Sequence, residues 1–181
     1  METGRHGVEI RNQPRSGFRR EWTFLAILAV GYAGQMLYAG RVLPDPVASH
    51  FNFRGDPDDT MSLRAYLIFM ALFGVGLPMF FIGLTKILRM IPVSMINLPH
   101  REYWFAPERV DIAIQILTRL MIWMACGMLL FFMGVHQLVI VANLSRPVRL
   151  PTIPFLVLLG IGLVSFLTWM ALLYRSFRIP A

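Results

Sequence analysis

The sequence is poor in cysteine and has no acidic residue or lysine inside its four long apolar stretches. The single cysteine, Cys126, excludes a disulfide within the chain, and its place in an apolar stretch predicts a small packing residue. Proton-coupled exporters normally need a carboxylate at membrane depth. The absence of one therefore disfavours a small drug–proton exchanger.

Histidine is equally scarce at membrane depth, where His136 is the only one within an apolar stretch. One histidine cannot supply both axial ligands of a b-type haem, so we predict no haem and no other cofactor. We expect His136 to hydrogen-bond a neighbouring helix through Gln35 or Gln137. No Ser/His/Asp or Cys/His pairing lies at membrane depth, and no glycine-rich phosphate loop occurs. The sequence therefore predicts a protein that is not an enzyme.

The composition predicts an integral membrane protein with one domain. Hydrophobic residues make up 56% of the chain, charged residues only 15%, and the mean hydropathy is +0.60. The net charge is +7, but the basic residues flank the apolar stretches instead of forming a patch. This distribution indicates contact with lipid headgroups and argues against binding to nucleic acid.

The apolar stretches predict an all-α four-helix membrane bundle, because each is long enough to cross a bilayer. We place a basic tail at 1–21 and a single transmembrane domain at 22–178. The length of the tail and of the first apolar stretch favours a retained first helix over a signal peptide. Pro78 should kink the second helix, so that a neighbour must satisfy a freed carbonyl. The helices are expected at about 22–42, 63–88, 108–143 and 151–175.

The distribution of Lys and Arg predicts the orientation of the bundle. Twelve of the seventeen lie in the two terminal segments and the connection between the second and third helices, and five lie in the other two connections. Both termini are therefore expected in the cytoplasm. The connection at 41–64 is then expected on the extracytoplasmic side.

This outer loop, RVLPDPVASHFNFRGDPDDTMSLR, gathers four aspartates with one histidine and one asparagine. A short extended segment that turns at 54–57 is expected. The Asp residues suit turn formation and the capping of a helix that begins near Ser62. Two alternatives remain open: a binding surface, or a cation site made by Asp56, Asp58, Asp59 and His50. The D-P-D-D spacing has neither the spread nor the closing Glu of a calcium loop.

The inner loop contains INLPHREYWFAPER, in which three aromatic residues stand beside Glu102, Glu108 and Arg109. Such a sequence is typical of an interfacial aromatic belt, and the alternative is a surface that docks a partner or a headgroup. Pro107 and Glu108 indicate the start of the third helix.

Together the two loops resemble a bacterial membrane family of unknown function that is related to the SdpI-type immunity proteins. LPDPVASHFNFRGDPDD matches the outer signature L-P-x-x-x-x-x-H-[FW]-[ND]-x-x-G-x-P-D, and INLPHREYWFAPER matches the inner segment N-x-P-x-x-x-Y-W-x-A-P-E-R. The resemblance implies a multi-pass protein of the bacterial plasma membrane. The immunity proteins protect bacteria from a secreted killing peptide and relay its presence to a repressor. This chain is shorter than they are and lacks their second-half motif.

The leading hypothesis is a binding, immunity or signalling component with no catalytic activity. Its expected partners are the lipid bilayer, an extracytoplasmic peptide, a cytoplasmic or membrane protein, and further copies of itself. The alternative is a transport component, an accessory subunit or oligomeric pore, lined by Gln35, Gln115, Arg119 and His136. No metal site is assigned, and the expected binding residues are His50, Asn52, Asp56 and Asp58 outside and Asn97, Tyr103, Trp104, Glu108 and Arg109 inside.

Overall fold

The computed structural model describes residues 18–179, so most of the predicted basic tail lies outside the described residues. Four helical segments are long and apolar enough to cross a membrane, which confirms the predicted all-α membrane bundle. The first begins at Arg19, earlier than expected, because 19–21 continue the helix. The segments are α1 (Arg19–Val42), α2 with α3 (Leu63–Ala71 and Leu77–Ile87), α5 (Val110–Leu144) and α6 (Thr152–Ser176).

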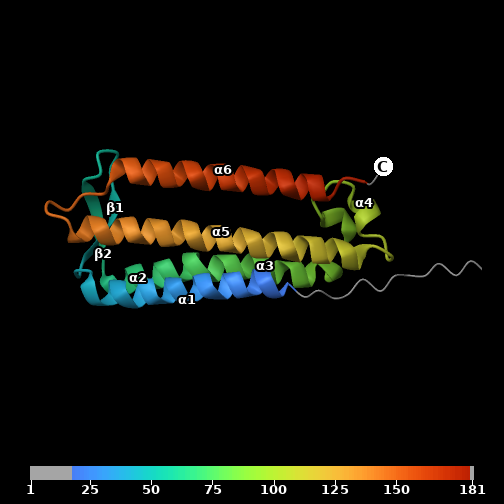
Figure 1. Ribbon diagram of the computed structural model, residues 1–181, viewed down its shortest axis with the longest axis horizontal. Coiled ribbons are helices and arrows are strands. Elements are labelled where there is room, and N and C mark those ends of the chain that lie inside the picture. Colours follow the sequence, from blue (N-terminus) through green and yellow to red (C-terminus); the bar gives the residue numbers. More distant parts are fainter. Residues whose placement is uncertain (1–17, 180–181) are drawn as a thin grey trace, which may run out of the picture.

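The connections form small structures at opposite ends of the bundle (Figure 1). At one end β1 (Val47–Phe51) and β2 (Pro57–Met61) pair as an antiparallel hairpin, which confirms the extended segment and turn predicted there. At the other end lie the short 3-10 helices Leu88–Met90 and Val93–Met95 and the helix α4 (Arg101–Trp104). The start of α1 and the end of α6 share that second end, as an even number of crossings requires.

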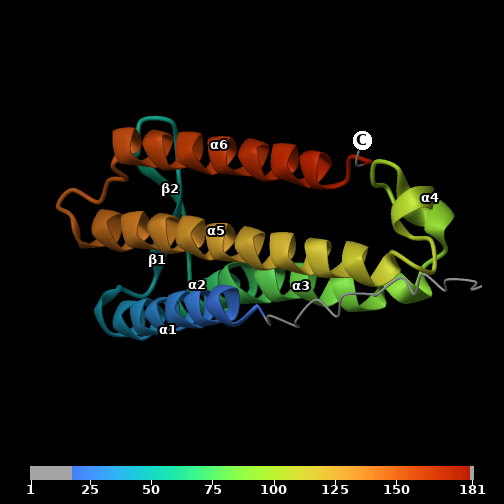
Figure 2. The ribbon, with the colours of Figure 1, turned by 45° about the vertical axis from the view of Figure 1, so that its right-hand side comes forward.

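The long helix α5 occupies the middle of the molecule (Figures 1 and 2). α1 and α3 pack against one side of it, and α6 lies along its other side, away from α1 in both views. No residue of α6 is buried within the described structure. The apolar faces of α6 are therefore available to lipid, and its packing within the chain comes mainly from α5.

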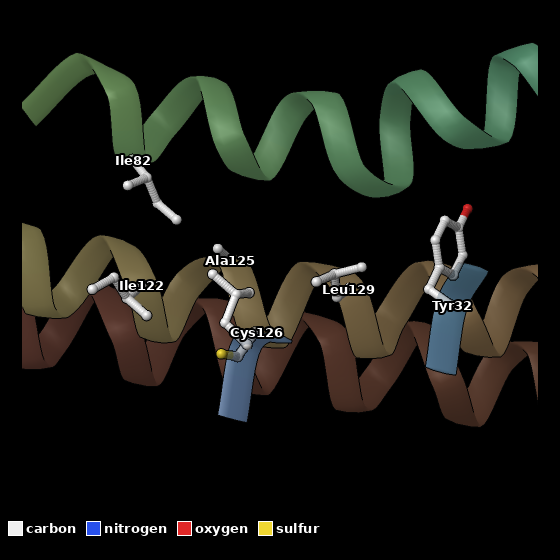
Figure 3. Close-up of a cluster of buried hydrophobic side chains, with 7 residues drawn as sticks. Tyr32, Ile82, Ile122, Ala125, Cys126 and Leu129 are labelled. Carbon is white, nitrogen blue, oxygen red and sulfur yellow. The ribbon is translucent and has the colours of Figure 1, made fainter. Parts of the chain in front are cut away.

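The mid-membrane core is a cluster of apolar side chains from α1, α3 and α5 (Figure 3). Cys126 lies in this cluster at 2% exposure, beside Ala125 and Leu129 of the same helix, which confirms its predicted packing role. Small residues at Ala125 and Cys126 allow close approach of helices, which is how membrane helices gain packing contacts without a hydrophobic driving force.

The second crossing changes its hydrogen-bond pattern just before Pro78. A single π-helical turn, Leu72–Gly76, joins α2 to α3, and Tyr32 of α1 donates its hydroxyl to the Met70 carbonyl at 2.7 Å. A Cβ at Gly74 would overlap that hydroxyl, so glycine makes room for it. A neighbouring helix thus donates to a carbonyl of this crossing, but the acceptor, Met70, lies eight residues before Pro78 and is not the carbonyl that the proline frees.

The expected hydrogen bond between His136 and a glutamine is wrong. Gln35 donates to the Gln137 side chain at 3.0 Å and to the Met133 carbonyl at 3.1 Å. His136 is fully buried with its ring edge-on to Tyr32 and Tyr66, and neither ring nitrogen has a hydrogen-bond partner among the described residues. Gln35 thus donates to Met133 and Gln137 while its own Oε1 has no partner among the described residues, and His136 lies in an aromatic environment.

Candidate functional site

The tip of the outer hairpin is a compact asparagine-based turn. The Asn52 carboxamide oxygen accepts from the backbone N–H groups of Arg54 at 2.8 Å and Asp56 at 3.1 Å. Gly55 has a φ of 83°, which glycine adopts at little cost. Asn52 therefore has a structural role in the turn, through an oxygen that is already occupied.

One buried side-chain amide of α5 holds the backbone of β1 against the bundle. Asn143, 2% exposed, accepts from the Ala48 N–H at 2.8 Å and donates to the Ala48 carbonyl at 2.9 Å. It also donates to the Val139 carbonyl at 2.9 Å. The side chain thus pairs with β1 as a neighbouring strand would, and it satisfies backbone groups that are shielded from water.

The hairpin tip is also held by the connection between α5 and α6. The Leu150 N–H donates to the Gly55 carbonyl at 2.8 Å, and a Cβ at Gly55 would overlap the Leu150 carbonyl. Arg149 donates through Nε and Nη2 to the Arg54 carbonyl at 3.1 and 3.0 Å, and its Nε lies 3.6 Å from the Asp56 carboxylate. The hairpin is therefore fixed to two parts of the bundle.

The Asp45 carboxylate caps the N-terminus of α2, the first helix of the second crossing. It accepts from the Leu63 N–H at 3.1 Å, and Ser62 accepts from the Ala65 N–H at 3.3 Å. The predicted Asp capping is thus present at the first aspartate of the loop. Asp59 instead accepts from the Thr60 N–H at 2.7 Å.

The exposed side chains of the hairpin include His50, Phe53 and Asp58. The His50 Nδ1 lies 2.6 Å from the Asp58 carboxylate, with the two side chains 73% and 44% exposed. Phe53 is fully exposed beside the turn. Asp56 contacts Arg149 while Asp58 contacts His50, so the residues of the cation alternative do not converge. Within 18–179, no group of three or more His, Cys, Asp or Glu side chains is placed to hold a metal ion.

At the inner end, Trp104 points into the protein. It is 8% exposed, its Nε1 donates to the Phe177 carbonyl at 2.9 Å, and its ring lies edge-on to Phe177 at 5.5 Å between centroids. These contacts join α4 to the residue after α6. Trp104 is therefore placed to hold the end of α6, and an interfacial belt facing the headgroups does not describe it.

The other predicted inner residues are placed differently from one another. The Arg109 guanidinium stacks on Tyr103, 4.0 Å from the ring centroid, and its Nε donates to the Tyr103 carbonyl at 2.8 Å. This pair braces the turn that leads into α5. Asn97 and Glu108 are exposed, and Asn97 lines an open pocket beside α4.

The four residues of the transport alternative do not gather along one path. Arg119 pairs with Glu21 of α1 at 3.2 Å, whereas Gln35 is bonded to Gln137. Gln115 is exposed and His136 is buried among aromatic rings. A continuous polar lining within a single copy is therefore not formed by these side chains.

Several residues that fix the site were not identified from the sequence. Asn143 has the clearest signal, because a lone amide near the end of an apolar helix must find a partner. Arg149 and Phe177 lie outside the recognised motifs. Phe53 lies within one, and it is exposed whereas Phe51, two residues before it, packs against the core.

Comparison with known protein families matches residues 24–74 to a domain of unknown function, DUF1648. The matched segment runs through α1, the hairpin and α2 into the π-helical turn, so it contains the outer site and not the inner one. No curated protein and no solved structure matches the chain. The match therefore covers the outer hairpin and its flanking helices, in a chain that has four helical segments long and apolar enough to cross a membrane.

Proposed function

We propose that the chain is a binding protein of the bacterial plasma membrane, without catalytic activity, whose outer hairpin recognises an extracytoplasmic peptide. Both termini lie in the cytoplasm, in keeping with the excess of Lys and Arg at that end. The inner loop then serves as the docking surface for a cytoplasmic or membrane protein. The DUF1648 match supports an SdpI-type relationship, since SdpI-type proteins carry this domain.

The observation that carries the proposal is that three exposed side chains of different chemistry stand on one hairpin, and that this hairpin is fixed to the bundle. His50 and Asp58 supply a charged or polar contact, and Phe53 supplies a large apolar one. The hairpin beneath them is bonded to α5 and to the α5–α6 connection. Binding to a pre-organised surface costs less conformational entropy than binding to a free loop, and exposed aromatic residues are common anchors in interfaces.

The test is affinity purification of tagged protein from its native membrane in mild detergent, with mass spectrometry of the co-eluting species. Phe53→Ala and Asp58→Ala are compared with wild type, because neither substitution removes a bond to the bundle. Glu108→Gln, exposed at the opposite end, is the matched control. We expect a peptide or protein to be lost in both hairpin variants and kept in the control.

Two results would contradict the proposal. One is a co-eluting species that is unaffected by Phe53→Ala and Asp58→Ala, and the other is the absence of any species besides the protein itself. In the second case, solute flux in proteoliposomes that contain only this protein would test the oligomeric pore.

A further inference from the structure

An open pocket of about 450 Å³ lies at the inner end of the bundle, formed by the segment before and within α4 and by the chain after α6. This volume is in the range of ligand sites. Eight residues line it, among them the apolar Ile96, Leu98 and Ile179 and the polar Asn97, Arg101 and Glu102.

We place the pocket at the depth of the lipid headgroups, because it lies just beyond the ends of two apolar helices. α3 ends at Ile87 and α6 ends at Ser176, and Ile179 lies just beyond that end. Within 18–179, this end of the chain carries nine basic residues and four acidic ones. The inner end is thus suited to a negatively charged group at the membrane surface.

Arg101 is held in position by its own loop. Its Nη1 donates to the Ser94 carbonyl at 2.8 Å and to the Ile96 carbonyl at 3.4 Å. A guanidinium has five N–H donors, so donors remain for a ligand. The Glu102 carboxylate, 79% exposed, lies 3.4 Å from the Arg101 Nε and lowers the positive charge of the pocket.

Asn97 adds an amide that is free for a ligand. Its side chain is exposed in the pocket and makes no hydrogen bond to another residue of the described chain. The Asn97 amide can donate to phosphate oxygens, and the Arg101 guanidinium can make charge-assisted hydrogen bonds to them. The apolar residues Ile96, Leu98 and Ile179 would contact the glycerol and the first methylenes of a lipid.

We propose that this pocket binds the headgroup of an anionic phospholipid, with Arg101 and Asn97 donating to its phosphodiester. The acyl chains then lie along the exposed apolar surface of α6, which buries none of its residues in the protein. The site is independent of the ligand of the outer hairpin, because the two lie at opposite ends of the bundle.

The experiment is native mass spectrometry of detergent-purified protein titrated with phosphatidylglycerol, phosphatidylethanolamine or phosphatidylcholine. Asn97→Asp places a negative charge beside the phosphate, and we expect phosphatidylglycerol binding about tenfold weaker. Glu102→Gln removes a negative charge, and we expect severalfold tighter binding. Arg54→Gln is the control, since it makes the same change in charge as Asn97→Asp at the outer end. A thermal melt of each variant verifies folding.

Three outcomes would overturn the proposal. Asn97→Asp and Arg54→Gln could weaken binding equally, which would indicate a general effect of net charge. Phosphatidylethanolamine could bind more tightly than phosphatidylglycerol and lose that preference in Glu102→Gln, which would indicate an ammonium site. Inorganic phosphate could displace the lipid at an equal concentration, which would indicate a soluble ligand.

Discussion

The two ends of the bundle hold the same helix, α6, by different means. At the outer end the contacts are hydrogen bonds: Arg149 and Leu150, just before α6, bond the carbonyls of Arg54 and Gly55. At the inner end Phe177, just after α6, is fully buried in an aromatic and aliphatic cluster that includes Trp104. Hydrogen bonds hold the outer end of α6, and the burial of an aromatic side chain holds its inner end.

The difference matters because α6 contributes little to its own placement. It buries no residue, and along its length it contacts the protein mainly through α5. Its polar bond to α5 inside the span is the donation from Trp169 Nε1 to the Leu120 carbonyl at 2.8 Å. The outer and inner motifs therefore both serve to set the position of α6, in addition to any binding function.

The largest loss of stability is expected from Trp104→Ala at the inner end. Truncating a buried tryptophan costs about 3–5 kcal/mol, and Trp104→Phe, which removes mainly the bond to Phe177, should cost about 1 kcal/mol. The measurement is thermal or denaturant unfolding in detergent. Trp123→Ala, at a side chain 48% exposed on α5, is the matched control. If the two alanine variants lost the same stability, the burial of Trp104 would not be what stabilises the inner end.

The next largest effect is expected from Asn143→Ala at the outer end. The substitution leaves the N–H and the carbonyl of Ala48 without their partner in a shielded site, at a cost of about 2–3 kcal/mol. Asn143→Asp retains an acceptor for the N–H but places a buried carboxylate oxygen against the carbonyls of Ala48 and Val139, so it should destabilise at least as much as alanine. Asn97→Ala, on an exposed asparagine, should change the unfolding midpoint very little. A wild-type midpoint for Asn143→Ala would mean that water replaces the amide.

The sequence predicts the crossings well because hydrocarbon thickness imposes their length directly. Each apolar stretch had to be helical, since backbone groups cannot remain unpaired in lipid. The hairpin was predictable for a local reason as well, because Asn52, Gly55 and Pro57 specify a turn through bonds within a few residues. Features encoded over short distances or by the membrane itself are therefore visible in the sequence.

The parts of the site that were not predicted depend on contacts between distant residues. Asn143 bonds Ala48, which lies 95 residues earlier in the chain, and Trp104 bonds Phe177, which lies 73 residues later. Whether an aromatic residue beside charged residues faces lipid or protein depends on which distant segment of the chain packs against it. The surroundings of His136 also depend on distant residues, because its ring neighbours come from α1 and α2, which pack against α5.

A smaller effect is expected from Gly55→Ala, which acts on the outer end alone. A left-handed backbone costs an alanine about 1–2 kcal/mol, and the added Cβ would also meet the Leu150 carbonyl. The unfolding midpoint should therefore fall. Gly83→Ala is the control, because this helical glycine has no atom within 4 Å of an added Cβ and should keep or raise the midpoint. If both variants behaved alike, the contact between the hairpin and the α5–α6 connection would be unimportant.

The smallest effect on global stability is expected from Arg149→Gln, because the arginine side chain is 58% exposed and exposed polar contacts contribute about 1 kcal/mol or less. The local effect should be larger, since the Arg54 carbonyl loses two donors and Asp56 loses its cation. Hydrogen–deuterium exchange should therefore rise in 52–56 while exchange around Trp104 stays at the wild-type rate. Arg178→Gln, at the inner end, should leave the hairpin unchanged. Faster exchange at both ends in Arg149→Gln would show instead that α6 moves as a rigid rod, so that loosening its polar end also loosens the end held by burial.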